Sequence, residues 1–268
     1  MSLSAKKIND HGVSESIGFI LIFAIIIAGV GLVTLYGYPL LLKQQVSADE
    51  QIMEKNMIVL QNDMKSLAYK TVPFKETSLK IGGGSLTVYN SSYSPSTFTI
   101  DITNPAGSTH YLSPWPFKSG ELRYESVSAQ TDISLQNGAV VMRPLINPGS
   151  TMLAEPRWFY DSQTNTMVIN LINITSDDSM AKAGIGTVQM TLGQTNYQLY
   201  NIPAGPANAI YVNYTSSSAQ DYTVAWDTYF TNSLKMSRIV STKYQLPTDT
   251  SHPATLVIKT YEVHIKNI

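Results

Sequence analysis

The stretch Ile17–Leu42, IGFILIFAIIIAGVGLVTLYGYPLLL, decides how this chain is organised. Its 26 residues include no charged side chain. As a helix it would be about 39 Å long, which exceeds the roughly 30 Å of a bilayer's hydrocarbon core. The core helix of a soluble domain rarely lacks a polar face over such a length. We therefore expect a membrane-spanning helix, and Lys6 and Lys7 before it favour a cytoplasmic N-terminus with the rest of the chain outside.

Two features inside this stretch bear on helix packing. Ala24, Ala28 and Gly31 follow one another at i, i+4 and i+7, which places three small residues on one helix face. Such a face lets helices approach closely, although a plain anchor with incidental small residues is the open alternative. Pro39 lacks an amide hydrogen, so we expect a kink or a broken hydrogen bond near Tyr36–Gly37.

The helical pattern continues beyond the apolar stretch and changes character. Apolar residues recur at spacings of four and three on one face: Met53, Met57, Leu60, Met64 and Leu67. This seam predicts an amphipathic helix over residues 43–70, which ends before Pro73. One long helix is thus expected over residues 13–72. Its second half is either a solvated stalk or a spine that packs on its own globular domain.

The remainder, residues 73–268, has the pattern of a β domain. Short alternating runs are separated by Gly, Pro, Asn and Ser, which is typical of an antiparallel β-sandwich. The expected strands are Ser78–Ile81, Ser85–Tyr89, Phe98–Ile102, Leu122–Val127, Ile133–Leu135, Ala139–Arg143, Trp158–Tyr160, Met167–Ile174, Thr187–Leu192, Tyr197–Tyr200, Ile210–Tyr214 and Leu256–Ile265. Gly82–Gly84 is expected to form a hairpin turn. The predicted fold class is therefore α+β.

One additional helix is expected inside the β domain. Five large apolar residues recur at helical spacing and form its buried face: Tyr222, Trp226, Tyr229, Phe230 and Leu234.

Composition and motifs argue against several functions. Charged residues make up 14% of the chain, against about 25% in ordinary soluble domains, and the formal net charge is −1. Such a weak field disfavours a nucleic-acid partner, and zero cysteines exclude a thiol nucleophile or a cysteine-based metal site. The four histidines have no ligand spacing, so we predict no catalytic, cofactor-binding or metal-binding residues. Glu121, Glu125 and Glu155 would act as paired acids only if the fold brought two together.

The start of the chain resembles a known family. His11–Ile20, HGVSESIGFI, leads directly into the apolar stretch and resembles the N-terminus of archaeal type IV pilins. Asn56–Lys65 and Glu155–Asp161, EPRWFYD, are similar to segments of an uncharacterised pilin-like family of methanogenic archaea. The resemblance implies that a prepilin peptidase cuts between Gly12 and Val13 and removes a leader of residues 1–12. A secretory cleavage after Ala48 is the alternative, but its apolar segment would be too long.

The resemblance also assigns a role to one carboxylate. Many pilins carry Glu at the fifth residue after the cut, where this chain has Ile17; its Glu15 stands at the third. Glu15 would pair with the α-amino group of Val13 in a neighbouring subunit, or else lie at the lipid headgroups as an ordinary interfacial carboxylate.

From these residues we expect a structural subunit of an archaeal pilus-like surface filament. It would wait in the cell membrane as a precursor and then polymerise with copies of itself through its N-terminal helices. The resemblance implies an assembly ATPase and a membrane platform protein as partners. The alternative is a membrane-anchored surface protein that does not polymerise, such as a minor pilin or adhesin. Three N-glycosylation sequons, at Asn90, Asn173 and Asn213, agree with an external domain.

Overall fold

The computed structural model describes residues 10–70, 72–94, 96–103, 109–112, 114–205, 208–217 and 220–268. The chain divides into two compact units, and the boundary in the sequence falls between Ala48 and Asp49. The N-terminal part of the expected leader, residues 1–9, lies outside the described residues. Gly12 and Val13 belong to a helix, but the side chains of residues 10–15, including that of Glu15, also lie outside the described part.

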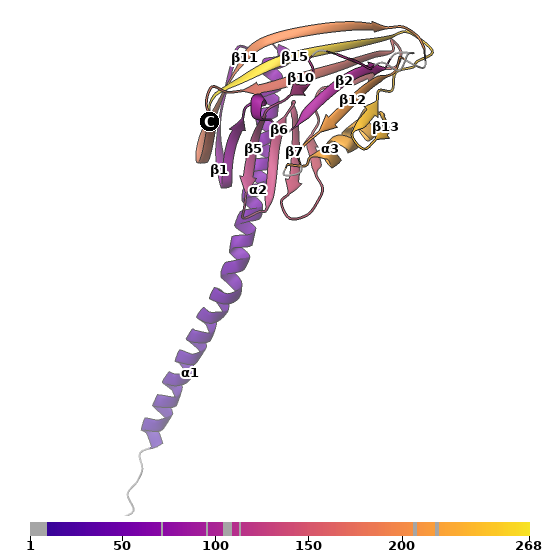
Figure 1. Ribbon diagram of the computed structural model, residues 1–268. Helices are drawn as coiled ribbons and strands as arrows, with labels where there is room; N and C mark the ends of the chain where they lie inside the picture. The colour runs from indigo at the N-terminus through magenta and orange to yellow at the C-terminus, as the bar shows by residue number, and fades with distance from the viewer. Residues whose placement is uncertain are drawn as a thin grey trace, which may run out of the picture. The chain divides into compact units, whose positions relative to one another are not determined.

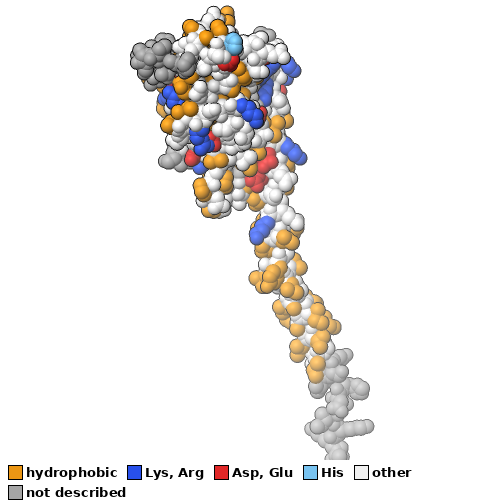
Figure 2. Space-filling view, turned by 90° about the vertical axis from the view of Figure 1, so that its right-hand side faces the viewer, with side chains coloured by type: hydrophobic (Ala, Val, Ile, Leu, Met, Phe, Trp, Pro, Cys, Tyr) orange, Lys and Arg blue, Asp and Glu red, His pale blue; other side chains and the backbone are white. Residues whose placement is uncertain are grey.

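The first unit is helical along its described length. It comprises α1 (Asp10–Leu32), the π-helical turn η1 (Val33–Gly37) and the start of α2 (Tyr38–Lys70). Figure 2 shows hydrophobic side chains along much of the described part of this helix. Among the described residues, the helix over Ser16–Lys70 is the one long and apolar enough to cross a membrane, with a mean hydropathy of 2.8 in its most apolar window. The apolar helix is therefore compatible with membrane anchoring.

The turn η1 marks the expected effect of Pro39. The amide of Tyr38 donates to the carbonyl oxygen of Val33, five residues earlier, instead of to the residue four back. Pro39 has no amide hydrogen and its ring occupies space near the preceding turn, so a widened π turn replaces the regular pattern. The predicted disturbance before Pro39 is confirmed.

The second unit, Asp49–Ile268, contains two β-sheets (Figure 1). The nine-stranded sheet has the order β8 (Thr151–Ala154), β7 (Ala139–Pro144), β6 (Thr131–Gln136), β5 (Glu121–Ser126), β1 (Phe74–Tyr89), β11 (Met180–Ile202), β15 (Ala254–Asn267), β10 (Thr166–Thr175) and β9 (Phe159–Asp161). The six-stranded sheet has the order β13 (Ser237–Val240), β14 (Lys243–Gln245), β12 (Ile210–Thr215), β2 (Thr97–Thr103) and β3 (Thr109–Tyr111), with β4 (Phe117–Lys118) also pairing with β2. A short 3-10 turn, η2 (Ser91–Tyr93), follows β1. All neighbouring strands are antiparallel except the parallel pair β10 and β15. A long N-terminal helix followed by mainly antiparallel sheets confirms the predicted α+β class.

The second half of α2 forms part of the core of this unit. The seam residues Met53, Met57, Leu60, Met64 and Leu67 are all 0% exposed. They pack with apolar side chains on one face of the nine-stranded sheet, from strands β1, β5, β6, β11 and β15. Of the two alternatives for this half of the helix, the structure shows the spine that packs on its own domain and not the solvated stalk. The second compact unit therefore begins at Asp49. The strand pattern alone places the start of the β domain later, at residue 73.

The opposite face of the nine-stranded sheet carries the second core. The six-stranded sheet packs there together with α3 (Thr223–Thr228) and the π turn η3 (Tyr229–Ser233). Phe98, Trp158 and Trp226 make edge or tilted ring contacts in this core, with centroids 4.8 to 6.2 Å apart. The five aromatic and apolar residues expected on the extra helix are all buried, as predicted. The unit thus has three layers, in which helix α2 and the smaller sheet cover opposite faces of the larger sheet.

The prediction of a hairpin turn at Gly82–Gly84 is wrong. Strand β1 continues through these glycines, and its register shifts between Ile81 and Leu86. A Cβ atom on Gly82 would lie 2.4 Å from a carboxylate oxygen of Asp49, and one on Gly84 would lie 2.2 Å from the carbonyl oxygen of Glu125. At Gly84 the backbone of strand β5 approaches β1 too closely for any side chain, so glycine is required there, whereas at Gly82 the nearest obstacle is the side chain of Asp49 on α2.

Other differences concern strand length. The two strands expected over Thr187–Leu192 and Tyr197–Tyr200 are parts of the single strand β11, which pairs with β15 on both sides of an irregularity between Leu192 and Thr195. Five short strands, β3, β4, β8, β13 and β14, were not expected. Their lengths of two to four residues give too little alternation for a pattern to reveal, so tertiary pairing determines them.

Candidate functional site

The two segments that the sequence singled out in the domain, Asn56–Lys65 and Glu155–Asp161, lie against each other in the structure. Gln61 on α2 is 2% exposed and stands within the apolar seam. Its side-chain amide donates to the carbonyl oxygen of Gly138 at 2.7 Å and to that of Glu155 at 3.0 Å. A buried polar side chain requires such partners, so this amide joins α2 to the β6–β7 turn and to the Glu155 segment.

The Glu155–Asp161 segment is fastened at several further points. The ammonium of Lys65 donates to the carbonyl oxygen of Glu155 at 3.0 Å, and the Glu155 carboxylate accepts from Ser233 at 2.5 Å. The indole of Trp158 donates to the carbonyl oxygen of Asn170 at 2.7 Å, and the side-chain amide of Asn170 donates to the Arg157 carbonyl. The segment is therefore held between α2, strand β10 and the turn η3.

Arg157 projects from this segment towards the end of α2. Its guanidinium lies 4.9 Å from the ring centroid of Tyr69, and the Tyr69 ring meets that of Tyr261 edge-on at 5.3 Å. A pocket of about 510 Å³ opens beside them, which we call the basic pocket. Its lining residues are Asn62, Lys65, Ser66, Tyr69, Lys70, Pro156 and Arg157.

The basic pocket perturbs two titratable groups. Burial lowers the pKa of the Lys65 ammonium, and the charge of Arg157 lowers it further, while the Glu155 carboxylate offsets part of the shift. Burial raises the pKa of the Tyr69 phenol, aided by Tyr261 and opposed by Arg157. The pocket is thus a crowded cationic environment beside aromatic rings.

A separate polar cluster lies between the two sheets. The guanidinium of Arg123 contacts Glu121 at 2.5 Å and Glu125 at 2.8 Å, and Ser134 donates to Glu121 at 2.5 Å. Burial, the largest single effect, lowers the pKa of Arg123, but the Glu121 carboxylate and the phenols of Tyr222 and Tyr89 together outweigh it, so the pKa is raised. Because Glu121 is 1% exposed and already paired with Arg123, this cluster is suited to joining strands β5 and β6 rather than to acid–base chemistry.

The three candidate acids are therefore not arranged as a catalytic pair. Glu121 and Glu125 share one guanidinium, whereas the Glu155 carboxylate is bound to Ser233. No group of three or more His, Asp or Glu residues that could hold a metal ion occurs in the part of the chain that the structure describes.

The sequence-predicted modification and packing residues lie elsewhere. Asn90 is half-buried, and its side-chain nitrogen donates to the Ser176 carbonyl at 2.7 Å. Asn173 on β10 and Asn213 on β12 are half-buried too, each with a buried side-chain oxygen. Ala24 and Ala28 are exposed on α1, Gly31 is half-buried there, and Pro39 is exposed on α2. The structure brings none of these described residues to the basic pocket.

Sequence reasoning missed the basic pocket because its residues come from segments about 90 positions apart. One signal was available in Gln61, a polar residue directly after Leu60 in an otherwise apolar seam. A polar residue at such a position indicates a buried hydrogen-bond partner elsewhere in the fold.

The fold and these contacts define a class of protein. It is an α+β protein with an apolar N-terminal helix compatible with membrane anchoring and a β domain that contains the second half of α2 in its core. A family of unknown function, DUF7289, matches residues 11–266, and the chain belongs to this family. No curated protein and no solved structure matches it.

Proposed function

We propose that this chain is a structural subunit of an archaeal pilus-like extracellular filament. One observation carries the proposal: α2 begins in an uncharged apolar segment and ends as a core element of the β domain. Residues 17–42 would form the helical centre of the filament, and the β domains would coat it. A prepilin peptidase would first cut between Gly12 and Val13, and an ATPase and a membrane platform would drive assembly.

The apolar helix supports the proposal through its exposure. Within its own unit, large side chains such as Phe19 and Leu35 are 70% and 71% exposed. Burial of apolar surface is worth about 25 cal/mol per Å², so this helix is stable only in lipid or among other apolar helices. Ala24, Ala28 and Gly31 would let neighbouring helices approach closely in such a bundle.

The packing of α2 supports the proposal because it attaches the helix firmly to the β domain. Met53, Met57 and Leu60 are fully buried, and Gln61 holds two carbonyl groups of the β domain. Residues 49–70 therefore cannot leave the domain unless its core opens. A filament under tension needs such an attachment between the bundled helices and the coat.

A membrane-anchored surface protein that does not polymerise is the second candidate. It is favoured by Ile17, which stands where many pilins carry the Glu that pairs with a neighbouring α-amino group. In this case the apolar helix would remain in lipid and the β domain alone would act.

Mass spectrometry of the native protein's N-terminus, combined with shearing of the cells, separates these functions. We expect a chain that starts at Val13 and sediments with sheared filaments visible by electron microscopy. A start at Val13 in the membrane fraction alone would favour the second candidate. A start at Asp49 would contradict both, because the apolar helix would then be discarded.

Two variants sharpen the test. Gly12→Leu should block processing and abolish filaments. Ala28→Leu should preserve processing but reduce filaments, because a larger side chain separates packed helices. The matched control is Ile22→Leu, which keeps the volume and should assemble normally. If Ala28→Leu formed as many filaments as Ile22→Leu, the proposed role of the small residues in helix packing would be contradicted.

A further inference from the structure

We propose that the basic pocket binds the anionic group of an acidic saccharide, a uronate carboxylate or a sulfate ester. The pocket lies wholly within the second unit, between the last two turns of α2 and the segment at Pro156 and Arg157. This inference does not depend on whether the protein forms filaments.

The first argument is the state of Arg157. The chain has four arginines, and three of them hold a carboxylate: Arg123, Arg143 and Arg238. Arg157 lies over the Tyr69 ring instead and forms no ion pair with any described residue. A guanidinium that faces a pocket without a carboxylate partner retains its paired N–H groups for an external anion.

The second argument is the charge of the lining. Lys65, Lys70 and Arg157 line the pocket, and no acidic residue is among the described lining residues. Burial lowers the pKa of Lys65, and the like charge of Arg157 lowers it further. The Glu155 carboxylate offsets this only in part, since it is bound to Ser233. An anion in the pocket would relieve the repulsion.

The third argument is that the cations are held in place. The carbonyl group of Arg157 accepts from Asn170, and its guanidinium rests against Tyr69. The ammonium of Lys65 uses one of its three hydrogens on the Glu155 carbonyl at 3.0 Å. Groups fixed in this way lose little conformational entropy when a ligand binds.

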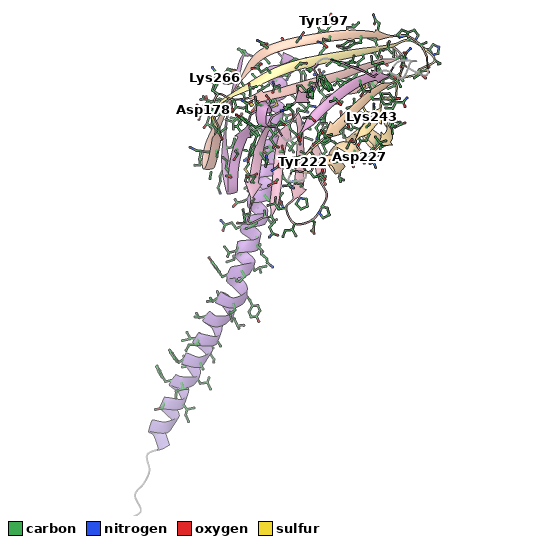
Figure 3. All side chains as sticks on the ribbon, viewed as in Figure 1. Asp178, Tyr197, Tyr222, Asp227, Lys243 and Lys266 are labelled. Atoms are coloured by element: carbon green, nitrogen blue, oxygen red, sulfur yellow. The ribbon has the colours of Figure 1, made fainter. Side chains whose placement is uncertain are left out.

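The remaining surface favours a saccharide over other anions. Asn62, Ser66 and Tyr69 add amide and hydroxyl groups to the lining, which suit the hydroxyls of a sugar. Beyond the Tyr69–Tyr261 contact lies a second pocket of about 530 Å³, which includes Tyr197 and Lys259. Tyr197 stands on β11 and is 66% exposed (Figure 3). An oligosaccharide would thus meet further aromatic faces and one more cation.

A nucleic acid is a poorer match. Its closely spaced phosphates are bound by broad basic surfaces, whereas this chain has a net charge of −1 and the two pockets together supply four cations. An acidic saccharide carries fewer and more widely spaced charges. A vesicle surface is also disfavoured, because the cations line a concave pocket.

The experiment is calorimetric titration of the full chain in a non-ionic polyoxyethylene detergent at low salt. The probes are trigalacturonate, a κ-carrageenan tetrasaccharide that carries sulfate esters but no carboxylate, and neutral galactotriose as the uncharged control. We expect one or both acidic probes to bind and galactotriose to bind at least tenfold more weakly. Preference between the two acidic probes identifies carboxylate or sulfate as the natural group. Affinity should fall as salt increases, because the interaction is between charges.

Variants assign the binding to the pocket. Arg157→Gln should weaken binding of the acidic probe by at least about tenfold, in line with the loss of a charge-assisted bidentate contact. Lys70→Gln changes an exposed side chain, should leave the melting temperature unchanged and should weaken binding about threefold. The matched control is Lys182→Gln, also exposed but on β11 outside the lining, which should bind as the unchanged protein does.

Several results would overturn the proposal. One is equal affinity of Arg157→Gln, Lys70→Gln and Lys182→Gln for the acidic probes. Another is equal binding of galactotriose and trigalacturonate. A third is no saccharide binding together with Arg157-dependent binding of single-stranded DNA or anionic vesicles, which would assign the pocket to a different ligand class.

Discussion

The side-chain amide of Gln61 donates to the carbonyl oxygen of Glu155 at 3.0 Å, in a layer where Gln61 itself is 2% exposed. The same nitrogen reaches Gly138 at 2.7 Å, so one helical residue satisfies two carbonyl groups of the β domain. This contact explains why α2 and the Glu155–Asp161 segment, which are far apart in the sequence, form one site.

We predict that Gln61→Leu lowers the free energy of unfolding by about 2–4 kcal/mol, because two buried carbonyl groups lose their donor. The matched control is Gln51→Leu, the same exchange at an exposed position of α2, which should change it by less than about 0.5 kcal/mol. Urea unfolding of the full chain, followed by tryptophan fluorescence, measures both. Equal effects of the two substitutions would show that the Gln61 bonds contribute nothing.

The triglycine provides a second prediction. A Cβ on Gly84 would press on backbone, the carbonyl oxygen of Glu125, whereas one on Gly82 would meet the side chain of Asp49. The Asp49 side chain is able to rotate away, but the β5 backbone is fixed by its strand pairs. We therefore expect Gly84→Ala to destabilise the domain by more than about 2 kcal/mol and Gly82→Ala by clearly less.

Thermal unfolding monitored by circular dichroism compares the two glycine variants directly. The double variant Gly82→Ala/Asp49→Ala should recover most of the loss of Gly82→Ala, since it removes the atoms that clash. If these glycines formed a turn instead of part of strand β1, Gly82→Ala would destabilise the domain as much as Gly84→Ala or more.

These glycines also show where sequence reasoning stops. The α2 seam was predictable because a helical period of 3.6 residues is a local property, and Met53 to Leu67 are all buried as expected. The conformation at Gly82 depends on Asp49, which is 33 positions away, so local turn statistics gave the wrong result. Likewise, no local pattern indicates that β10 and β15 pair in parallel or that Arg157 reaches Tyr69.

Strand β5 shows a related limit. Its alternate residues Glu121, Arg123 and Glu125 are charged, a pattern typical of a strand face exposed to water. In the structure the smaller sheet covers this face, and Glu121 and Arg123 are 1% and 3% exposed. The charges are tolerated because they neutralise one another, which only the tertiary arrangement reveals.

The same cluster supports a third prediction. Arg123→Met leaves Glu121 buried without its counter-charge and should lower the free energy of unfolding by about 3–5 kcal/mol. The double variant Glu121→Leu/Arg123→Met removes both charges and should be more stable than Arg123→Met. Denaturant unfolding of the two single variants and the double variant completes the cycle.

The control for this cycle is the half-exposed pair of Arg238 and Asp227. Arg238→Met should cost less than about 1 kcal/mol, because water screens the remaining carboxylate. A double variant at Glu121 and Arg123 that is as unstable as the sum of its single variants would contradict the coupling.

The final prediction concerns alkaline pH. Burial raises the pKa of four of the 16 tyrosines strongly: Tyr69, Tyr214, Tyr222 and Tyr229. Between the ordinary tyrosine pKa of about 10 and the raised values, the folded chain holds more protons than the unfolded chain. The stability these phenols contribute is therefore complete below about pH 10 and is lost as the pH rises further. Their tyrosinate absorbance should appear only with unfolding, monitored by circular dichroism.

A pair of phenylalanine variants tests the origin of this loss. The Tyr222 hydroxyl is buried without a hydrogen-bond partner among the described residues, so Tyr222→Phe should maintain or raise stability at neutral pH and reduce the alkaline loss. The Tyr214 hydroxyl lies 3.2 Å from that of Ser96, so Tyr214→Phe should cost about 1 kcal/mol at neutral pH while reducing the alkaline loss equally. Tyrosinate absorbance that develops fully before any unfolding would contradict the prediction, since phenols able to ionise in the native fold are not buried from water.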